Sequence, residues 1–310
     1  MTTGGAVLHS TDPLDLLFRA AVTAIDAGDM TMLERLLTQH PRLLRDRLDT
    51  PSAWLRDKVG GALDGFFQKP YLLWFVAEDP VRNGTLPSNI AQVTRAIIRG
   101  AEQVGVESLP EQLDYALRLV SWSWIARECG VQIELIDVLV DAGASPDGNP
   151  ENALVNGNFA AAEHLVRRGA TLTLATALCL GRWDDVPRLA GAASARDRQF
   201  GLALAAHSGR ADALKRVIDL WVELNSPSPD LFSHATALHH AVASGSLEAV
   251  KVLVEAGADL STCDTVWNGT PLGWAEHCRG EHLHDERGRQ YAEIAAYLGR
   301  DDHSDTEGRG

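Results

Sequence analysis

One short pattern occurs twice near the C-terminal end of the chain, and its spacing constrains the fold more than any other feature. Thr236-Ala237-Leu238-His239-His240-Ala241 is followed 34 residues later by Thr270-Pro271-Leu272-Gly273-Trp274-Ala275. Between the two copies, apolar residues recur at the spacing of one helix face, at Leu247, Val250, Leu253 and Val254. Gly257-Ala258-Asp259 then supplies a turn. The pattern predicts pairs of helices that must stack on one another to bury their apolar faces.

These two segments resemble the ankyrin repeat, whose first helix begins with the motif T-P-L-H-x-A. The first copy matches this motif at every position except Pro, and the second at every position except His. The resemblance implies an all-α, ankyrin-like solenoid of helix-turn-helix repeats with short finger loops. It also implies that His239 has a structural role, tying neighbouring loops together. Ankyrin-repeat proteins mostly mediate protein contacts and have no inherited active site.

Upstream glycines extend the repeat pattern with less regular spacing. Gly157, Gly181, Gly209 and Gly245 are separated by 24, 28 and 36 residues. The first two intervals are too short for a full repeat, so they predict bare helical hairpins without a long finger loop. Leu14 to Leu44 is expected to cap the array. We expect one array over residues 13–299, with insertions near 46–90 and 276–290, and disordered tails at 1–12 and 300–310.

Composition narrows the classes of partner. The chain has 42 acidic and 28 basic side chains and a net charge of −14, which opposes binding to nucleic acid and to anionic membranes. Its four cysteines have no paired spacing, and Met1 to Ser10 contains neither a basic leader nor an apolar run. These features predict a cytoplasmic protein without disulfides. No dinucleotide, P-loop or nucleophile-elbow motif is present, so we expect no cofactor.

Candidate binding residues are the histidines and tryptophans expected in loops, together with two polar neighbours. His234 precedes the first motif in a turn that should point into the groove, and Trp267 lies in the next finger loop. Trp122 and Trp124 are two residues apart, so on one helix only one of them can face the core. Each residue also has a structural alternative, either packing between repeats or a turn bonded to backbone. The groove candidates are His234, Trp267, Asp264, His207, Trp122, Trp124, Arg127 and Trp183.

A second cluster invites comparison with metal sites. His277, Cys278, His282 and His284 occur close together, beside Asp285 and Glu286. Structural zinc sites usually present two ligand pairs at fixed spacings, and this cluster does not. The favoured interpretation is a solvated polar loop, so no metal is predicted. Cys129, which follows Arg127 and Glu128, has no visible partner that would activate it as a nucleophile.

Two functions remain open. The first is recognition of a protein partner by the concave groove. The second is a small-molecule pocket built from Trp122 or Trp124 with Trp183, His207, His234 and Trp267. Such a pocket could serve a cofactor-free acid-base enzyme of the cyclase, isomerase or hydrolase type. No catalytic residue can be assigned, and the sequence favours the absence of enzymatic activity. A deep, enclosed pocket would support the second function, and an open groove the first.

The charge balance generates a prediction about nonspecific binding. At about 0.15 M salt the protein should bind neither duplex DNA nor anionic lipid vesicles, because its net field repels both. Fluorescence anisotropy with labelled DNA and co-sedimentation with vesicles measure this directly. Tight, salt-sensitive binding to either would show that a local basic patch outweighs the net charge.

Overall fold

The computed structural model describes residues 13–77 and 83–301, and within these ranges the chain is helical with no β-strand. The predicted tail 1–12, residues 302–310 of the other predicted tail and residues 79–82 of the Asp79–Pro87 loop lie outside the described residues. The all-α prediction is confirmed. Contacts divide the chain into two compact units, Met1–Thr171 and Leu172–Gly310. The single array over residues 13–299 stays a prediction, because the two units are described separately.

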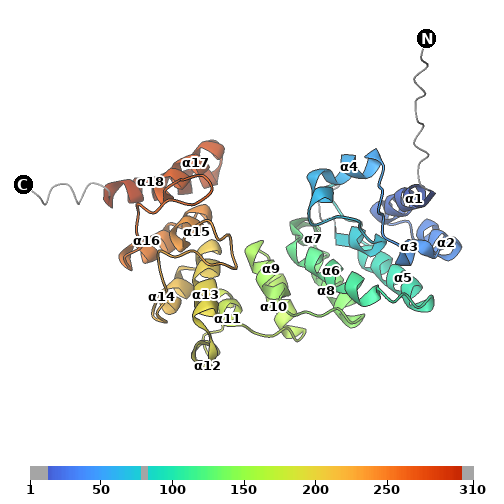
Figure 1. Ribbon diagram of the computed structural model, residues 1–310, viewed down its shortest axis with the longest axis horizontal. Coiled ribbons are helices and arrows are strands. Elements are labelled where there is room, and N and C mark those ends of the chain that lie inside the picture. Colours follow the sequence, from blue (N-terminus) through green and yellow to red (C-terminus); the bar gives the residue numbers. More distant parts are fainter. Residues whose placement is uncertain (1–12, 78–82, 302–310) are drawn as a thin grey trace, which may run out of the picture. The chain divides into compact units, whose positions relative to one another are not determined.

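The first unit opens with the predicted cap. Helices α1 and α2 pack together, and the residues expected on their apolar faces, including Phe18, Ile25 and Leu33, are buried. The unit consists, in chain order, of α1 (Pro13–Ala27), α2 (Met30–Gln39), α3 (Arg42–Arg45), α4 (Ala53–Val59), η1 (Gly60–Asp64), η2 (Leu72–Ala77), α5 (Ile90–Gln103), α6 (Leu109–Trp122), α7 (Trp124–Glu128), α8 (Gln132–Asp141), α9 (Asn149–Val155) and α10 (Phe159–Arg167) (Figure 1).

The predicted insertion near residues 46–90 contains the most buried segment of this unit. All six residues of η2 are buried, and η2 contacts α1, α3, α5 and α6. An α-helix with one apolar face would expose part of such a segment. Leu72–Ala77 is instead apolar on every side, so it can be buried among helices in all directions. The segment forms a short 3-10 helix.

One buried carboxylate fastens residues 46–64 to α1. Asp15 accepts hydrogen bonds from the Ser52 amide (3.0 Å), the Ser52 hydroxyl (2.6 Å) and the Trp54 indole N–H (2.7 Å). Asp15 is 1% exposed, so its charge depends on these three donors. The partners lie 37 and 39 residues away in sequence, and they hold the start of α4 against α1.

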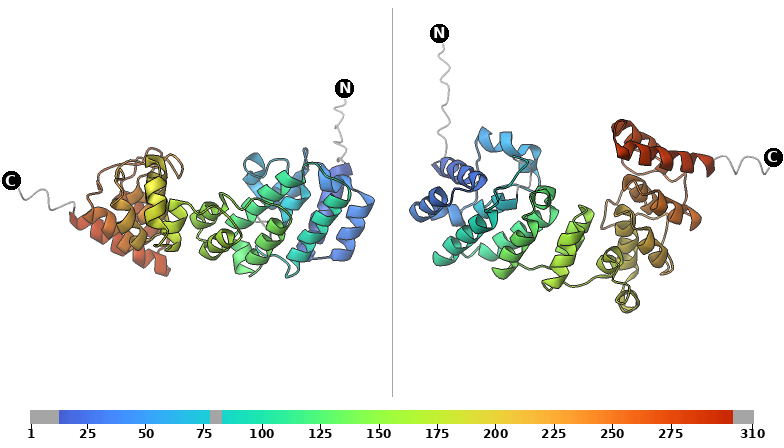
Figure 2. Two further views of the ribbon diagram at one scale, coloured as in Figure 1. Left: turned by 90° about the horizontal axis from the view of Figure 1, so that it is seen from below. Right: turned by 180° about the vertical axis from the view of Figure 1, so that it is seen from behind.

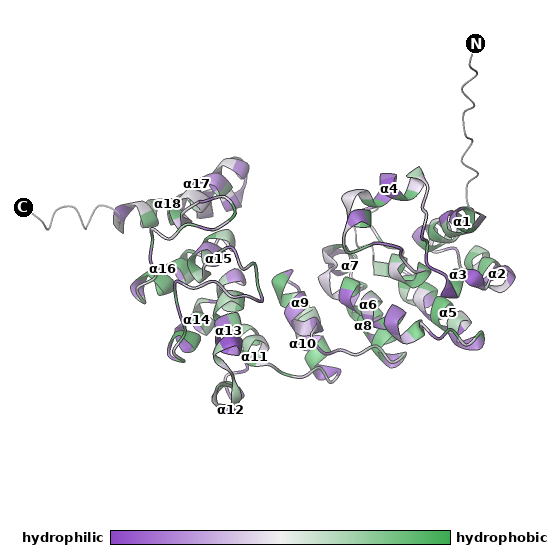
Figure 3. Cartoon of the chain, in the orientation of Figure 1, coloured by the Kyte–Doolittle hydropathy of each residue, from purple (hydrophilic) through white to green (hydrophobic). Residues whose placement is uncertain are grey.

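The second unit is a regular stack of helix pairs. Its helices are α11 (Leu174–Leu180), α12 (Val186–Ala192), α13 (Ala195–His207), α14 (Ala211–Ile218), α15 (Ala237–Ala243), α16 (Leu247–Glu255), α17 (Pro271–Glu281) and α18 (Glu286–Asp301). The first helices α11, α13, α15 and α17 contact one another in a row, and α14, α16 and α18 form a second row. Figure 2 shows the same order from two further sides. Helices such as α14 and α16 have an apolar and a polar side (Figure 3), as stacking requires.

The recurring glycines mark the turns inside the helix pairs. Gly157, Gly181, Gly209 and Gly245 have φ angles between 65° and 74°, a left-handed conformation that favours glycine. Gly209 is also closely packed, because a side chain there would meet Ser246 at 3.0 Å. Short connections join α10 to α11 and α12 to α13, so the prediction of bare middle hairpins is confirmed.

The predicted insertion at residues 276–290 is largely helical. Its first part belongs to α17 and its last part to α18, with a turn at residues 282–285. His282 Nδ1 lies 2.9 Å from Asp285 in this turn. None of the helices in the described part of the chain has the length and apolar composition needed to cross a membrane.

The burial of Asp15 predicts a large effect on stability. Asp15→Ala should lower the free energy of unfolding of the first unit by about 2–4 kcal/mol, because it leaves the Ser52 amide and the Trp54 indole N–H unpaired. Urea unfolding that is monitored by amide hydrogen exchange in α1 and α4 measures this change in the free energy of unfolding. Asp57→Ala, at an exposed position of α4, should stay within about 0.5 kcal/mol. Equal effects of the two substitutions would contradict the proposed role of Asp15.

Candidate functional site

Five aromatic rings of the second unit form a continuous row that we call the aromatic ladder. His207 and Phe232 have ring centroids 5.4 Å apart, and Phe232 and His234 are 6.4 Å apart. His234 lies 5.2 Å from Trp267 and 6.1 Å from Trp274, and the two indoles are 5.7 Å apart. Each step is within the range of direct ring contact. The ladder therefore crosses three successive helix pairs.

The repeat architecture explains how these residues meet. His207 ends α13, Phe232 and His234 lie in the loop before α15, and Trp267 lies in the loop before α17. Because the first helices are stacked, their preceding loops lie beside one another. The prediction that His234 and Trp267 share one edge is confirmed. The Thr265 amide also donates to the His234 carbonyl at 2.9 Å, which joins the two loops.

Asp264 organises the finger loop that carries Trp267. Its carboxylate accepts hydrogen bonds from the Val266, Trp267 and Gly269 amides (2.8, 2.7 and 2.8 Å) and from the Trp274 indole N–H (3.0 Å). Burial raises the pKa of Asp264, but these four donors outweigh it and hold the pKa well below its ordinary value. Asp264 was a groove candidate. The structure places it behind the loop, 2% exposed, where it positions the residues that face the groove.

His239 makes the contact between loops that the ankyrin resemblance implies. It is fully buried. Its Nδ1 accepts from the Thr236 hydroxyl (2.8 Å) and the Thr236 amide (3.3 Å), and its Nε2 donates to the Gly269 carbonyl (3.0 Å). One side chain thus caps α15 and holds the next finger loop.

The neighbouring His240 is a buried, neutral histidine. It is 2% exposed, and its ring packs against His207 and Phe232 at 5.8 and 6.0 Å. Burial, and to a smaller extent the neighbouring histidines, lower its pKa from 6.5 to about 3. Its Nε2 is buried without a hydrogen-bond partner among the described residues.

Beside the ladder, α17 borders an apolar groove of about 500 Å³, which we call the α17 groove. Trp267 is 68% exposed although its loop is fixed, and small residues leave space next to the two indoles. The groove is lined by Ala243, Trp267, Gly269, Gly273, Trp274, His277 and Cys278. The last four lining residues lie on one face of α17, at the spacing of a helix.

Sequence reasoning missed Trp274 and Phe232 as site residues. A signal existed for Trp274, because it occupies in the second motif the position that His240 holds in the first. Phe232 had no such signal: its φ angle of 41° is unusual for a residue other than glycine. Trp183, a candidate, is absent from the ladder and instead lies under the Arg216 guanidinium, 4.4 Å from the ring centroid.

Comparison with models of known families agrees with the helix pairs of the second unit. A family model described as ankyrin repeats in three copies matches residues 152–264 and, in an overlapping placement, residues 202–283. Residues 152–283 of the chain therefore consist of ankyrin repeats. Among solved structures, the human ASB11 ankyrin repeat domain is similar, with 17% identity and a TM-score of 0.32 over 66% of this chain and 94% of that chain. No curated protein matches.

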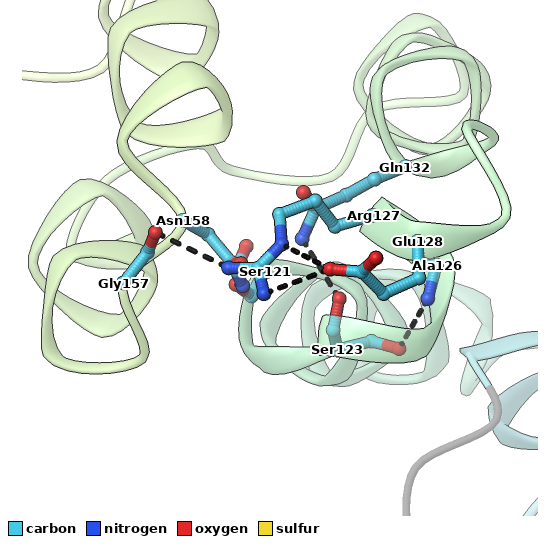
Figure 4. Close-up of polar contacts among 8 residues, drawn as sticks. All are labelled: Ser121, Ser123, Ala126, Arg127, Glu128, Gln132, Gly157 and Asn158. Carbon is cyan, nitrogen blue, oxygen red and sulfur yellow. Dashed lines mark hydrogen bonds and ion pairs between the residues drawn. The ribbon is translucent and has the colours of Figure 1, made fainter. Parts of the chain in front are cut away.

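The remaining candidates, Trp122, Trp124 and Arg127, belong to the first unit. Arg127 donates to the Asn158 side chain (2.9 Å) and the Gly157 carbonyl (3.3 Å), and its guanidinium also contacts Glu128 at 3.1 Å (Figure 4). Asn158, 1% exposed, donates to the Ser121 carbonyl at 2.8 Å. Arg127 therefore joins α7 to the turn between α9 and α10, and its hydrogen bonds have a structural role.

The two tryptophans near Arg127 lie on different helices, α6 and α7, although the expectation that one of them leaves the core agrees with the exposure of Trp124. Ser123 is extended, ends α6 and caps α7, and its hydroxyl accepts from the Ala126 amide at 3.0 Å (Figure 4). Trp122 packs against Phe66 with centroids 5.6 Å apart, and Trp124 is 51% exposed. Cys129 Sγ accepts from the Leu86 amide at 3.4 Å.

The polar cluster near the C-terminal end is spread over the end of α17, the turn at residues 282–285 and the start of α18. His277 Nε2 lies 3.5 Å from Glu281, and His282 pairs with Asp285 as described above. Across residues 13–77 and 83–301, no three His, Cys, Asp or Glu side chains are grouped so that they could hold a metal ion.

The buried histidines predict how stability depends on pH. Burial lowers the folded-state pKa of both His239 and His240 below 6.5, so on acidification the unfolded chain takes up protons first. The contribution of each histidine is complete above pH 6.5 and is lost as the pH falls toward its folded-state pKa, which is about 3 for His240. His240→Gln, which does not titrate, should flatten this dependence by up to about 1.4 kcal/mol per pH unit. Urea unfolding between about pH 5 and 8 tests it, and identical slopes in both proteins would contradict it.

Proposed function

We propose that the chain binds a protein partner through the aromatic ladder and the α17 groove of its second unit. The observation that carries the proposal is Trp267, a large aromatic side chain that is exposed although its loop is fixed by four hydrogen bonds to Asp264. Tryptophan is enriched among residues that dominate binding energy at protein interfaces. Ankyrin repeats generally mediate such contacts, which supports the same conclusion.

Rigidity adds to the argument. Ordering a flexible loop on binding opposes association, whereas a loop that is already ordered avoids this cost. Hydrogen bonds hold the Trp267 loop at both ends. The Thr265 amide donates to the His234 carbonyl, and His239 Nε2 donates to the Gly269 carbonyl. A partner would therefore meet a preformed aromatic surface.

The small-molecule or enzymatic alternative receives less support. Of the residues expected to build that pocket, only Trp267 lines the α17 groove. Two buried polar groups of the second unit, His240 and Asp264, are also poorly suited to acid-base chemistry. His240 has a pKa of about 3, far below the neutral range in which a general base works best. Asp264 is committed to four donors, so it is a structural carboxylate.

The proposal predicts a selective loss of binding. Trp267→Ala should weaken partner binding by about 30-fold or more, as expected for a central tryptophan, without lowering the melting temperature, because the side chain is exposed. His234→Ala should also weaken binding. His239→Ala should mainly lower stability, by about 1–3 kcal/mol, because it removes buried hydrogen bonds.

Quantitative pull-down from extracts of the source cells measures this, with Trp221→Ala as the matched control. Trp221 is 91% exposed in the same unit but lies outside the ladder. A partner lost with Trp267→Ala and retained with Trp221→Ala supports the proposal. A partner that survives Trp267→Ala, or is lost only with Trp221→Ala, would refute it.

A further inference from the structure

The α17 groove combines two indole walls with the carboxylate of Glu281, which lies one helical turn beyond the lining residue His277. The planes of Trp267 and Trp274 are inclined at 67°, with centroids 5.7 Å apart, so they border the groove as a corner. Gly269, Gly273 and Ala243 leave room beside them. Glu281 follows His277 by four residues on α17, a rise of about 6 Å, and contacts it at 3.5 Å.

Elsewhere the chain fills comparable aromatic surfaces with its own arginines. Arg216 lies over Trp183, at 4.4 Å from the ring centroid. Arg47 lies 4.2 Å from Tyr71 and 5.1 Å from Trp74, and also forms an ion pair with Glu111. Aromatic faces beside a carboxylate therefore hold a guanidinium in the first unit of this protein.

The α17 groove has the same components without the cation. In the described ranges, no arginine or lysine lies over Trp267 or Trp274, and none pairs with Glu281. The charge of Glu281 acts on the groove, because after burial it is the next cause that raises the pKa of Cys278. The net charge of −14 also favours a cationic guest.

We propose that the α17 groove receives an arginine side chain of the partner, stacked on the indoles of Trp267 and Trp274 with its guanidinium directed toward Glu281. This inference rests on the proposed protein-binding function and specifies its chemistry. Arginine fits better than an apolar side chain because it supplies both a planar face for the indoles and donors for the carboxylate. It fits better than lysine because its guanidinium is less strongly hydrated.

The test uses the full chain labelled with 5-fluorotryptophan and followed by 19F NMR. The signals of Trp267 and Trp274 are assigned with Trp→Phe variants. The probes are Nα-acetyl-arginine methylamide and Nα-acetyl-citrulline methylamide, which have nearly the same shape but differ in charge. The arginine probe should shift the Trp267 signal saturably and bind at least threefold more tightly than the citrulline probe, at the lower end of the roughly 2- to 30-fold that cation–π contacts supply. Equal affinities, or no shift at Trp267, would overturn the inference.

Two variants of α17 locate the carboxylate. Glu281→Gln should lower the affinity for the arginine probe at least twofold and leave the affinity for the citrulline probe unchanged. Glu276→Gln, an exposed position on the other side of α17, should change neither. Both glutamates are exposed, so folding is not at risk, and the signal of Trp221 should not move. An unchanged arginine affinity in Glu281→Gln would overturn the assignment of that residue.

The outcomes separate this inference from the proposed function. A partner that depends on Trp267, together with equal affinities of the two probes, would retain the protein-binding function and overturn the arginine site. Conversely, the arginine probe could bind more tightly than the citrulline probe at Trp267 while Trp267→Ala leaves partner binding unchanged. That result would retain the arginine site and overturn the placement of the protein-binding surface.

Discussion

The second unit depends on the buried carboxylate of Asp264. An ionised carboxylate without hydrogen bonds could not remain at 2% exposure, and each of the four N–H groups that satisfy it fixes part of the site. Three are amides of its own loop, so they determine the path from Val266 to Gly269. The fourth is the Trp274 indole N–H, which anchors the loop to α17. The loop then presents its Gly269 carbonyl to His239 of the preceding repeat. Removing this carboxylate would disturb the loop, the indole and the contact between repeats together.

Local signals made much of this fold predictable. Glycines at the helix turns and apolar residues at helical spacing are properties of short segments, so α1, α2, α15 and α16 follow from the sequence. The meeting of His234 and Trp267 was also predictable, because the repeat period places equivalent loops side by side. Asp264 was assigned to the groove wrongly, since its burial depends on a donor ten residues away in α17. An exposed acid and a buried one look the same in sequence until their donors are known.

Long-range contacts account for what the sequence did not predict. The path of residues 46–64 is set by Asp15, whose partners are more than 35 residues away. Six apolar residues in a row, as in Leu72–Ala77, indicate burial but not which helices will surround them, so the 3-10 conformation could not be derived. At Ser123 the chain ends α6 and begins α7 instead of continuing one helix. The serine hydroxyl caps α7, and this local bond outweighs the continuation of α6 through Trp124.

Several arginines of this acidic chain make their contacts inside the fold. Arg127 makes its hydrogen bonds with the turn between α9 and α10, Arg47 covers Tyr71 and Trp74, and Arg216 covers Trp183. Each joins segments that are distant in sequence, so its cation acts within the fold. Trp267 differs because no basic side chain in the described ranges lies over it. An indole that the fold holds rigidly but leaves uncovered has its electron-rich face available to a guest. The surrounding excess of carboxylates makes that guest more favourable as a cation than as an anion. Shape and charge in the α17 groove therefore select for the same kind of partner.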